Sequence, residues 1–186
     1  MRRGAVLAMC LVWASPGFAD QPLLRPSRDV DVTYRATARQ GGKEIEQRVR
    51  WLSASQTMRI DPPSPGLHVI IDYPARRMSV VQDAARSVVE MAAPDSMADM
   101  IGGATATAFV RRGEATVAGL GCIEWRTQDR EAHPVLVCIT EDGVLLRAGT
   151  VEQVRVIAVS VQYAPQDPAV FRIPTDYQRQ SPRTAR

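Results

Sequence analysis

Hydrophobic and polar residues alternate along most of this chain, in short runs separated by turn-forming residues. The stretch VDVTYRATA (30–38) puts its valines and tyrosine on one side and its polar residues on the other. A period of two is typical of a strand with one buried face. The stretch EIEQRVRWL (44–52) alternates in the same way, so a two-residue Gly-Gly loop between them predicts a hairpin that pairs Tyr34 with Val49.

Prolines and glycines divide the rest of the chain into further short strands. Three prolines follow Asp61 and end one such strand, because proline cannot donate to a sheet ladder. About ten antiparallel strands with little helix predict a mainly β protein, and we expect a curved half-barrel. The remaining strands are expected at 57–61, 67–72, 77–82, 87–91, 115–118, 122–128, 135–140, 144–149 and 154–163.

The segment 94–110 breaks this alternation. Met97, Met100 and Ile101 recur at helical spacing before two glycines interrupt the pattern. Since every clear strand has one apolar face, that face needs a cover. The segment is therefore expected to form a short helical lid over the sheet.

The chain begins with two arginines, an eleven-residue apolar run and small residues before Asp20, which is the pattern of a secretory signal peptide cleaved after Ala19. Cys10 follows a methionine rather than a small residue, so lipidation is not expected. We expect a periplasmic protein, made of a signal peptide (1–19), an irregular lead-in (20–29), a half-barrel domain (30–178) and a disordered tail (179–186).

Charge gives no case for nucleic acid. Removal of residues 1–19 takes two arginines and no acid, which leaves 21 basic and 20 acidic residues. The basic residues are scattered along alternating strands, which is typical of a solvated face.

Two cysteines, Cys122 and Cys138, remain after this cleavage, with fifteen residues between them. Asp142-Gly143 predicts a two-residue type I′ turn, which sets Ile139 opposite Leu146 and Val137 opposite Ala148. A second loop centred near residue 130 then pairs Ile123 with Val137, Trp125 with Val135 and the two cysteines with each other, on the outer face. A structural disulfide is favoured over reduced thiols, a zinc site, which would need more ligands, or a redox pair, which usually has two intervening residues.

No motif for a nucleophile, a catalytic zinc or a phosphate loop occurs, so we expect no enzyme, cofactor or metal. His68 and His133 are interpreted as surface imidazoles. Asp61, Asp72 and Asp83 each end a strand, where aspartate favours turns by local hydrogen bonding.

The five methionines that remain after cleavage fall within residues 58–100. Methionine is flexible and polarisable, so these side chains either fill the core or line an adaptable apolar cavity.

Several segments together resemble the lipoprotein-carrier-like (LolA-type) superfamily, most closely its uncharacterised periplasmic branch. The likeness covers about 30–177 and rests on five segments: VRWLSASQTMRID, HVIIDYPARRMSVVQDAARSVVEM, VAGLGCIEWRT, CITEDGVLLRA and FRIPTDY. The resemblance implies an unclosed, strongly bent antiparallel sheet with helical cover on its concave side. Members of this superfamily carry acyl chains of lipoproteins or sense such lipids and mislocalised envelope proteins.

The sequence and the resemblance together favour a non-catalytic binding protein whose concave apolar face holds a lipid, an acyl chain or an apolar segment of an envelope protein. The alternative is an envelope structural or assembly partner with a filled core. We expect a monomer with at most peripheral membrane contact. The expected lining residues are Trp51, Met58, Ile60, Val69, Ile71, Met78, Val80, Met97, Met100 and Ile101.

Overall fold

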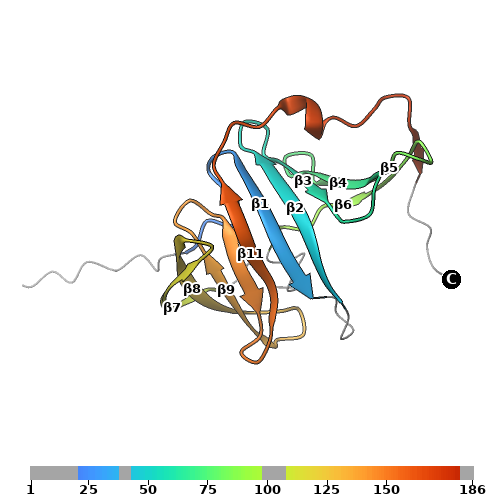
Figure 1. Ribbon diagram of the computed structural model, residues 1–186. Coiled ribbons are helices and arrows are strands. Elements are labelled where there is room, and N and C mark those ends of the chain that lie inside the picture. Colours follow the sequence, from blue (N-terminus) through green and yellow to red (C-terminus); the bar gives the residue numbers. More distant parts are fainter. Residues whose placement is uncertain (1–20, 38–42, 98–107, 181–186) are drawn as a thin grey trace, which may run out of the picture.

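The computed structural model describes residues 21–37, 43–97 and 108–180, and its strands form one continuous twelve-stranded sheet (Figure 1). The strand order is β12-β6-β5-β4-β3-β2-β1-β11-β10-β9-β8-β7. The elements are β1 (Val30–Thr37), β2 (Glu44–Leu52), β3 (Thr57–Asp61), β4 (Leu67–Asp72), β5 (Arg77–Gln82), β6 (Ser87–Ala92), β7 (Val110–Val117), β8 (Leu120–Gln128), β9 (Pro134–Ile139), β10 (Leu145–Gly149), β11 (Val154–Gln162), the 3₁₀ helix η1 (Pro168–Phe171) and β12 (Gln178–Gln180).

The sheet is antiparallel except for β12, and it is curved and open. Neighbouring strands follow one another along the chain except at two places, where β1 pairs with β11 and β12 pairs in parallel with β6. The expected mainly β half-barrel is therefore confirmed. Most of the expected lid, including Met100 and Ile101, lies outside the described residues, as does the expected signal peptide. None of the helices in the described ranges has the length and apolar character needed to cross a membrane.

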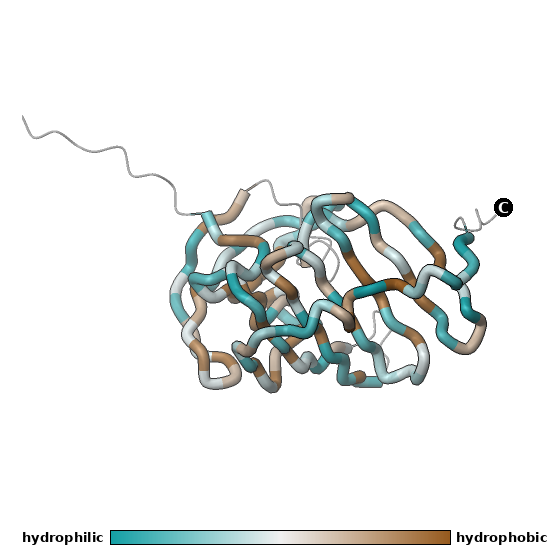
Figure 2. Tube along the Cα trace, turned by 90° about the horizontal axis from the view of Figure 1, so that it is seen from above, coloured by the Kyte–Doolittle hydropathy of each residue, from teal (hydrophilic) through white to brown (hydrophobic). Residues whose placement is uncertain are grey.

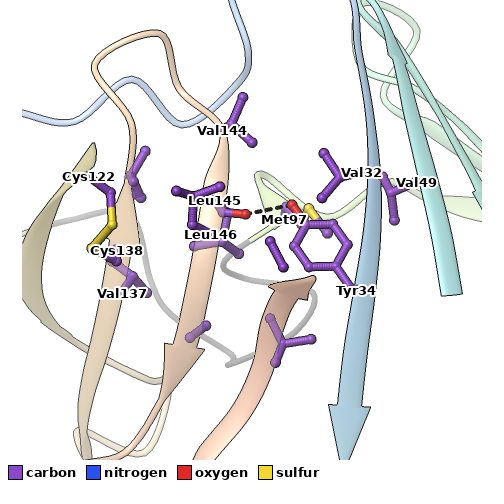
Figure 3. Close-up of a cluster of buried hydrophobic side chains, with 14 of the residues drawn as sticks. Val32, Tyr34, Val49, Met97, Cys122, Val137, Cys138, Val144, Leu145 and Leu146 are labelled. Carbon is purple, nitrogen blue, oxygen red and sulfur yellow. Dashed lines mark hydrogen bonds between the residues drawn. A yellow bond between two sulfur atoms is a disulfide. The ribbon is translucent and has the colours of Figure 1, made fainter. Parts of the chain in front are cut away.

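The alternation seen in the sequence builds one apolar face, which we call the core face. In β1 the side chains of Val30, Val32 and Tyr34 are all at least 98% buried. The Tyr34 hydroxyl donates a hydrogen bond of 2.6 Å to the Leu145 carbonyl across the core, as Figure 3 shows. In Figure 2 hydrophobic and hydrophilic stretches alternate along the trace, as one buried and one wet face require.

The register of the first hairpin differs from the prediction by two residues. Tyr34 pairs with Gln47, and Val49 pairs with Val32. A shift of two keeps every side chain on its predicted face, so the hydrophobic pattern fits both registers equally well. The connecting residues 38–42 lie outside the described residues.

The turn between β9 and β10 is also not the predicted type I′ turn. The Gly143 N–H donates to the Thr140 carbonyl, and the Thr140 N–H donates to the Val144 carbonyl. Only Gly143 within this turn has a positive φ, of 91°, which corresponds to a three-residue loop that ends in a left-handed glycine. The pair Val137–Ala148 forms as predicted, whereas a bulge places Leu145 opposite Ile139.

The predicted disulfide between Cys122 and Cys138 is present, with the two Cα atoms 5.5 Å apart (Figure 3). Its predicted register is wrong by two residues, because Glu124 lies opposite Cys138 and Trp125 lies opposite Val137. The bridge is therefore diagonal. It lies on the face opposite Trp125, as predicted, but both cysteines are at least 95% buried.

The chain end after β11 covers the outer face of β3–β6. The Arg59 side chain, which points away from the core face, donates a hydrogen bond of 2.7 Å to the Val170 carbonyl at η1. Phe171 is 93% buried, and Gln178–Gln180 pairs with β6. The prediction of a disordered tail is therefore wrong for Arg179 and Gln180; residues 181–186 lie outside the described residues.

Two predictions about polar residues near this covering segment are also wrong. His68 is 6% exposed, so it is not a surface imidazole, whereas His133 is exposed as predicted. Asp72 accepts a hydrogen bond from the Ala75 N–H in a turn, as expected. Asp61, however, does not serve a turn but pairs with the arginines of β2 and β3.

Candidate functional site

The seven expected lining residues in β2–β5 share one face of the sheet, and two of them border a nearly filled apolar cavity. Trp51, Met58 and Met97 line an apolar cavity. Five others, Ile60, Val69, Ile71, Met78 and Val80, share that face through the registers of β2–β5, and the remaining two are the lid residues outside the described ranges.

This cavity is almost completely filled. Its free volume is about 20 Å³, roughly enough for a single water molecule. The chain segment before β1 closes it, since Leu23, Leu24 and Pro26 contribute to its wall. Met97 closes it from another side and is 94% buried. The structure thus favours methionine as core filler at Met58 and Met97.

Polar contacts fix the segment 21–29 in this position. The Ser27 N–H donates to the Asp142 carbonyl at 2.8 Å, and the Arg28 guanidinium pairs with the Asp142 carboxylate at 2.8 Å. Arg28 also stacks on the Tyr163 ring at 3.6 Å, while Arg25 stacks on another tyrosine at 4.4 Å. The expected irregular lead-in is therefore anchored against the core, with Leu24 partly buried there, although it contains no strand.

Glycine at position 143 makes this close approach possible. A Cβ atom there would lie 2.2 Å from the Arg25 carbonyl oxygen and 3.1 Å from the Leu23 Cβ. Only a residue without a side chain leaves room for the segment to cross the β9–β10 turn.

One donor in the cavity wall lacks a partner in the part of the chain that the structure describes. Trp51 is 98% buried, and its indole N–H makes no hydrogen bond there. An unpaired buried donor costs about 1–3 kcal/mol unless a water or another acceptor reaches it. The Trp51 indole is therefore a buried donor without an acceptor among the described residues.

A second, open depression lies at the end of the sheet where the β7–β8 and β9–β10 turns meet the segment before β1. Its volume is about 640 Å³. We call it the end groove. It is lined by Arg28, Glu114, Ala115, Thr116, Leu120, Gly121, Cys122, Ile123, Thr140, Glu141, Asp142 and Tyr163.

The charges of the end groove are mainly negative. Burial raises the pKa of Asp142, but hydrogen bonds from Thr140, Arg28 and Tyr163 outweigh it and hold the pKa below its usual value. Among the described residues that line the groove, the only cation is Arg28, which is paired with Asp142. Of the other two acids, Glu114 pairs with Arg111, and Glu141 forms no ion pair within the described ranges.

A cluster of polar side chains lies on the outer face of the sheet, beneath the chain end that follows β11. Asp61 accepts hydrogen bonds from Arg50 and Arg59, and His68 lies 3.7 Å from Asp83. Burial is the largest effect and lowers the pKa of His68. The positive charges of Arg59 and Arg50 lower it further. Together these effects outweigh the carboxylates of Asp83 and Asp61, which raise the pKa. The imidazole is consequently held neutral over more of the acidic range than a free histidine.

Mild acid is expected to destabilise the protein through His68. The unfolded chain takes up this proton near pH 6.5, before the folded chain does. The free energy of unfolding therefore falls as the pH drops from about 6.5 towards the lowered pKa, by at most about 1.4 kcal/mol per pH unit. Urea unfolding between pH 7.5 and 5 should show a smaller loss for His68→Gln, which cannot titrate. An unchanged slope in His68→Gln would contradict this account.

The loop between β8 and β9 brings Asp129, Glu131 and His133 together, with their ligating atoms within 4.8 Å of one another. One oxygen of Asp129 already accepts the backbone N–H groups of Glu131 and His133. This arrangement is that of a carboxylate that closes a loop, so we assign no metal to it.

Sequence reasoning did not identify the groove residues. Tyr163 and Arg28 lie outside the predicted strands or at their ends, and alternation says nothing of how such residues meet. A signal did exist for the segment before β1, because adjacent leucines at positions 23 and 24 are unusual in an exposed lead-in.

No model of a known protein family matches this chain, and no curated protein matches it in sequence. Solved structures do. A conserved protein from Thermus thermophilus superposes with a TM-score of 0.58 at 15% identity, over 84% of this chain and 91% of that one.

Two further structures share the fold. The complex of MucA and MucB from Pseudomonas aeruginosa gives a TM-score of 0.52 at 13% identity, over 81% of this chain and 57% of the matched one. PNGF-II gives 0.52 at 11% identity, over 83% of this chain and 32% of its own length. This chain thus spans little more than half of the chain matched in the MucA–MucB complex and about a third of PNGF-II. At such identities the shared property is the fold, and the open curved sheet of this chain is of the MucB type.

Proposed function

We propose that this protein is a non-catalytic binding protein of the bacterial cell envelope that holds a segment of another envelope protein. The observation that carries the proposal is the contrast between its two cavities. The apolar cavity bordered by Trp51 and Met97 has only about 20 Å³ free, whereas the end groove, of about 640 Å³, is open and is lined by three acids and one cation. The fold is shared with MucB, which was solved in complex with another protein, MucA.

The same fold and the sequence motifs support membership of the LolA-type superfamily. Two features support an exported, periplasmic location. The N-terminal pattern is that of a signal peptide. The disulfide uses both cysteines that would remain after cleavage, and such bonds persist in oxidising compartments.

The arrangement of the two histidines supports a role other than catalysis. His133 contacts Asp129, and His68 lies near Asp83. Within the described ranges, no hydroxyl or thiol forms a hydrogen bond with either imidazole. A nucleophile activated by a neighbouring base requires such a contact.

A second candidate function is supported by the unpaired Trp51 indole. An acyl chain with a carbonyl oxygen would satisfy this donor and match the apolar wall around it. Such a ligand needs far more room than about 20 Å³, so the segment 21–26 would first have to leave the cavity. The contacts of that segment make this the weaker candidate.

Native mass spectrometry of the gently purified protein, together with chemical cross-linking in intact cells, tests the proposal. We expect the mass of the bare chain and cross-links to an envelope protein. A stoichiometric co-purified lipid would instead support the second candidate. If wild-type cells give no cross-links and the purified protein carries no lipid, both candidate functions are contradicted.

A further inference from the structure

One edge of the sheet is closed by a strand from the chain's own end. β12 is three residues long and pairs in parallel with the first half of β6. The second half of β6, Glu90–Ala92, has no strand on that side among the described residues. In Figure 1 the chain end, in red, reaches the β5–β6 end of the sheet. An edge strand carries backbone donors and acceptors that can pair with another chain, and β12 covers only half of this one.

The register of β12 places its side chains on known faces of the sheet. Arg179 lies on the outer face, where it forms an ion pair with Glu90. Gln178 and Gln180 lie on the core face, and Gln180 is opposite Val89. Val89 belongs to the apolar row of that face and is half-buried. An apolar side chain at the position of Gln180 would extend this row, whereas the exposed glutamine does not.

The contacts of β12 are weak compared with those that hold the chain end before it. Phe171 is 93% buried, and the Val170 carbonyl accepts a hydrogen bond of 2.7 Å from Arg59. In β12 all three side chains are exposed, and its ion pair with Glu90 lies at the surface. Surface ion pairs contribute little stability, and parallel pairing is slightly less stable than antiparallel pairing. β12 can therefore leave the edge while the chain up to Phe171 stays in place.

We propose that the β6 edge binds an extended segment of another protein by strand addition, and that β12 is the chain's own strand that this segment replaces. The incoming segment pairs with all six residues of β6 instead of three, which supplies more main-chain hydrogen bonds. Its apolar side chains lie on the core face beside Val89 and Met91, both half-buried. Its alternate side chains lie on the outer face and are polar, as Arg179 is.

This edge is at the opposite end of the strand order from β7 and β8, which line the end groove. The β6 edge is thus a contact surface beyond the one proposed above, and either can fail without the other.

Two variants of the full mature chain change β12 in opposite directions. Gln178→Pro with Gln180→Pro removes N–H groups that face β6, one of which donates to the Arg86 carbonyl at 2.8 Å, so β12 should be released. Gln178→Val with Gln180→Val raises the β propensity and extends the apolar row, so β12 should hold its own edge more firmly. The matched control, Gln153→Val with Gln162→Val, changes two exposed glutamines elsewhere in the sheet.

The ligands are two fluorescent six-residue probes with arginine at the second position, threonine at the fourth and sixth, and either valine or glutamine at the others. In fluorescence anisotropy the valine probe should bind the proline variant at least tenfold more tightly than the valine variant. The wild type and the control should lie between them and agree within twofold. The glutamine probe should bind the proline variant at least tenfold more weakly than the valine probe does. Equal affinity of the two variants, or of the two probes, would overturn the proposal.

Hydrogen exchange of the proline variant locates the contact. Amides of β6 should lose protection when β12 is released and regain it when the valine probe binds. Protection only at other strands would overturn the proposal, as would dimerisation of the proline variant in analytical ultracentrifugation, which would make a second copy the occupant.

Circular dichroism checks that each variant is folded. If the proline variant is not, the valine variant remains the test, and it should bind the valine probe at least threefold more weakly than the wild type. Failure of these probe experiments would leave the envelope binding role standing, because cross-linking in cells tests that role separately.

Discussion

Replacing both bridged cysteines, Cys122→Ala with Cys138→Ala, is expected to lower the free energy of unfolding by about 3 kcal/mol. The bridge spans a sequence separation of 16 and restricts the unfolded chain accordingly. Such a loss is a large part of the stability of a domain of this size. Guanidinium unfolding, followed by tryptophan fluorescence, measures the change.

Wild-type protein kept under reducing conditions is the control for the packing that is lost when both cysteines become alanine. It retains both sulfur atoms in their buried places but lacks the cross-link, so its loss should come close to that of the double variant. A reduced protein as stable as the oxidised one would show that the bridge contributes no stability.

The second large effect is expected at Gly143. Gly143→Ala should cost about 3 kcal/mol, since it combines a left-handed backbone that alanine adopts at a cost with a direct clash. The new Cβ would lie 2.2 Å from the Arg25 carbonyl oxygen, so the segment before β1 would have to move off the core face. Urea unfolding measures the loss. Limited proteolysis should then cut near Leu24 faster than in the wild type.

Gly119→Ala is the matched control. Gly119 also has a positive φ, of 78°, but a Cβ there would meet nothing within 4 Å. This variant should cost only the backbone strain, about 1 kcal/mol. The difference between the two variants reports the packing of the segment, and equal losses would show that the clash relaxes without cost.

Most strand positions could be predicted from this sequence, although β12 was missed and β7 begins at Val110 within the expected lid, and strand registers could not. Alternation located the strands and the faces of β1, β2, β8 and β9. Both wrong registers, at Tyr34 and at Cys138, are shifted by two residues, and such a shift leaves every face unchanged. Turn geometry decides between these registers, and the loop that ends at Gly143 illustrates how one left-handed residue changes it.

The burial of His68 could have been anticipated only in part. Strands covered on both faces contain adjacent apolar residues rather than strict alternation. Such pairs occur at Ile70-Ile71, Val80-Val81 and Val88-Val89 in β4–β6. They indicate a second covered face, but they do not reveal that the chain end returns over it, because that contact joins Arg59 to Val170 across more than a hundred residues.

The candidate site shows the same limit. The expected lining residues do share one face, yet the sequence could not show that the chain's own Leu23 and Leu24 would close the space above them. Volume left inside a fold depends on three-dimensional packing. The end groove, likewise, is lined by residues from four separate parts of the chain.

The pairing of β1 with β11 has a consequence for how the chain acquires its structure. Val32 pairs with Val161, so the middle of the sheet is completed only when nearly the whole polypeptide has been synthesised. Contacts between such distant residues slow the search for the native state. A nascent chain of this kind can form its local hairpins early, but it joins the two halves of the sheet only after β11 has emerged.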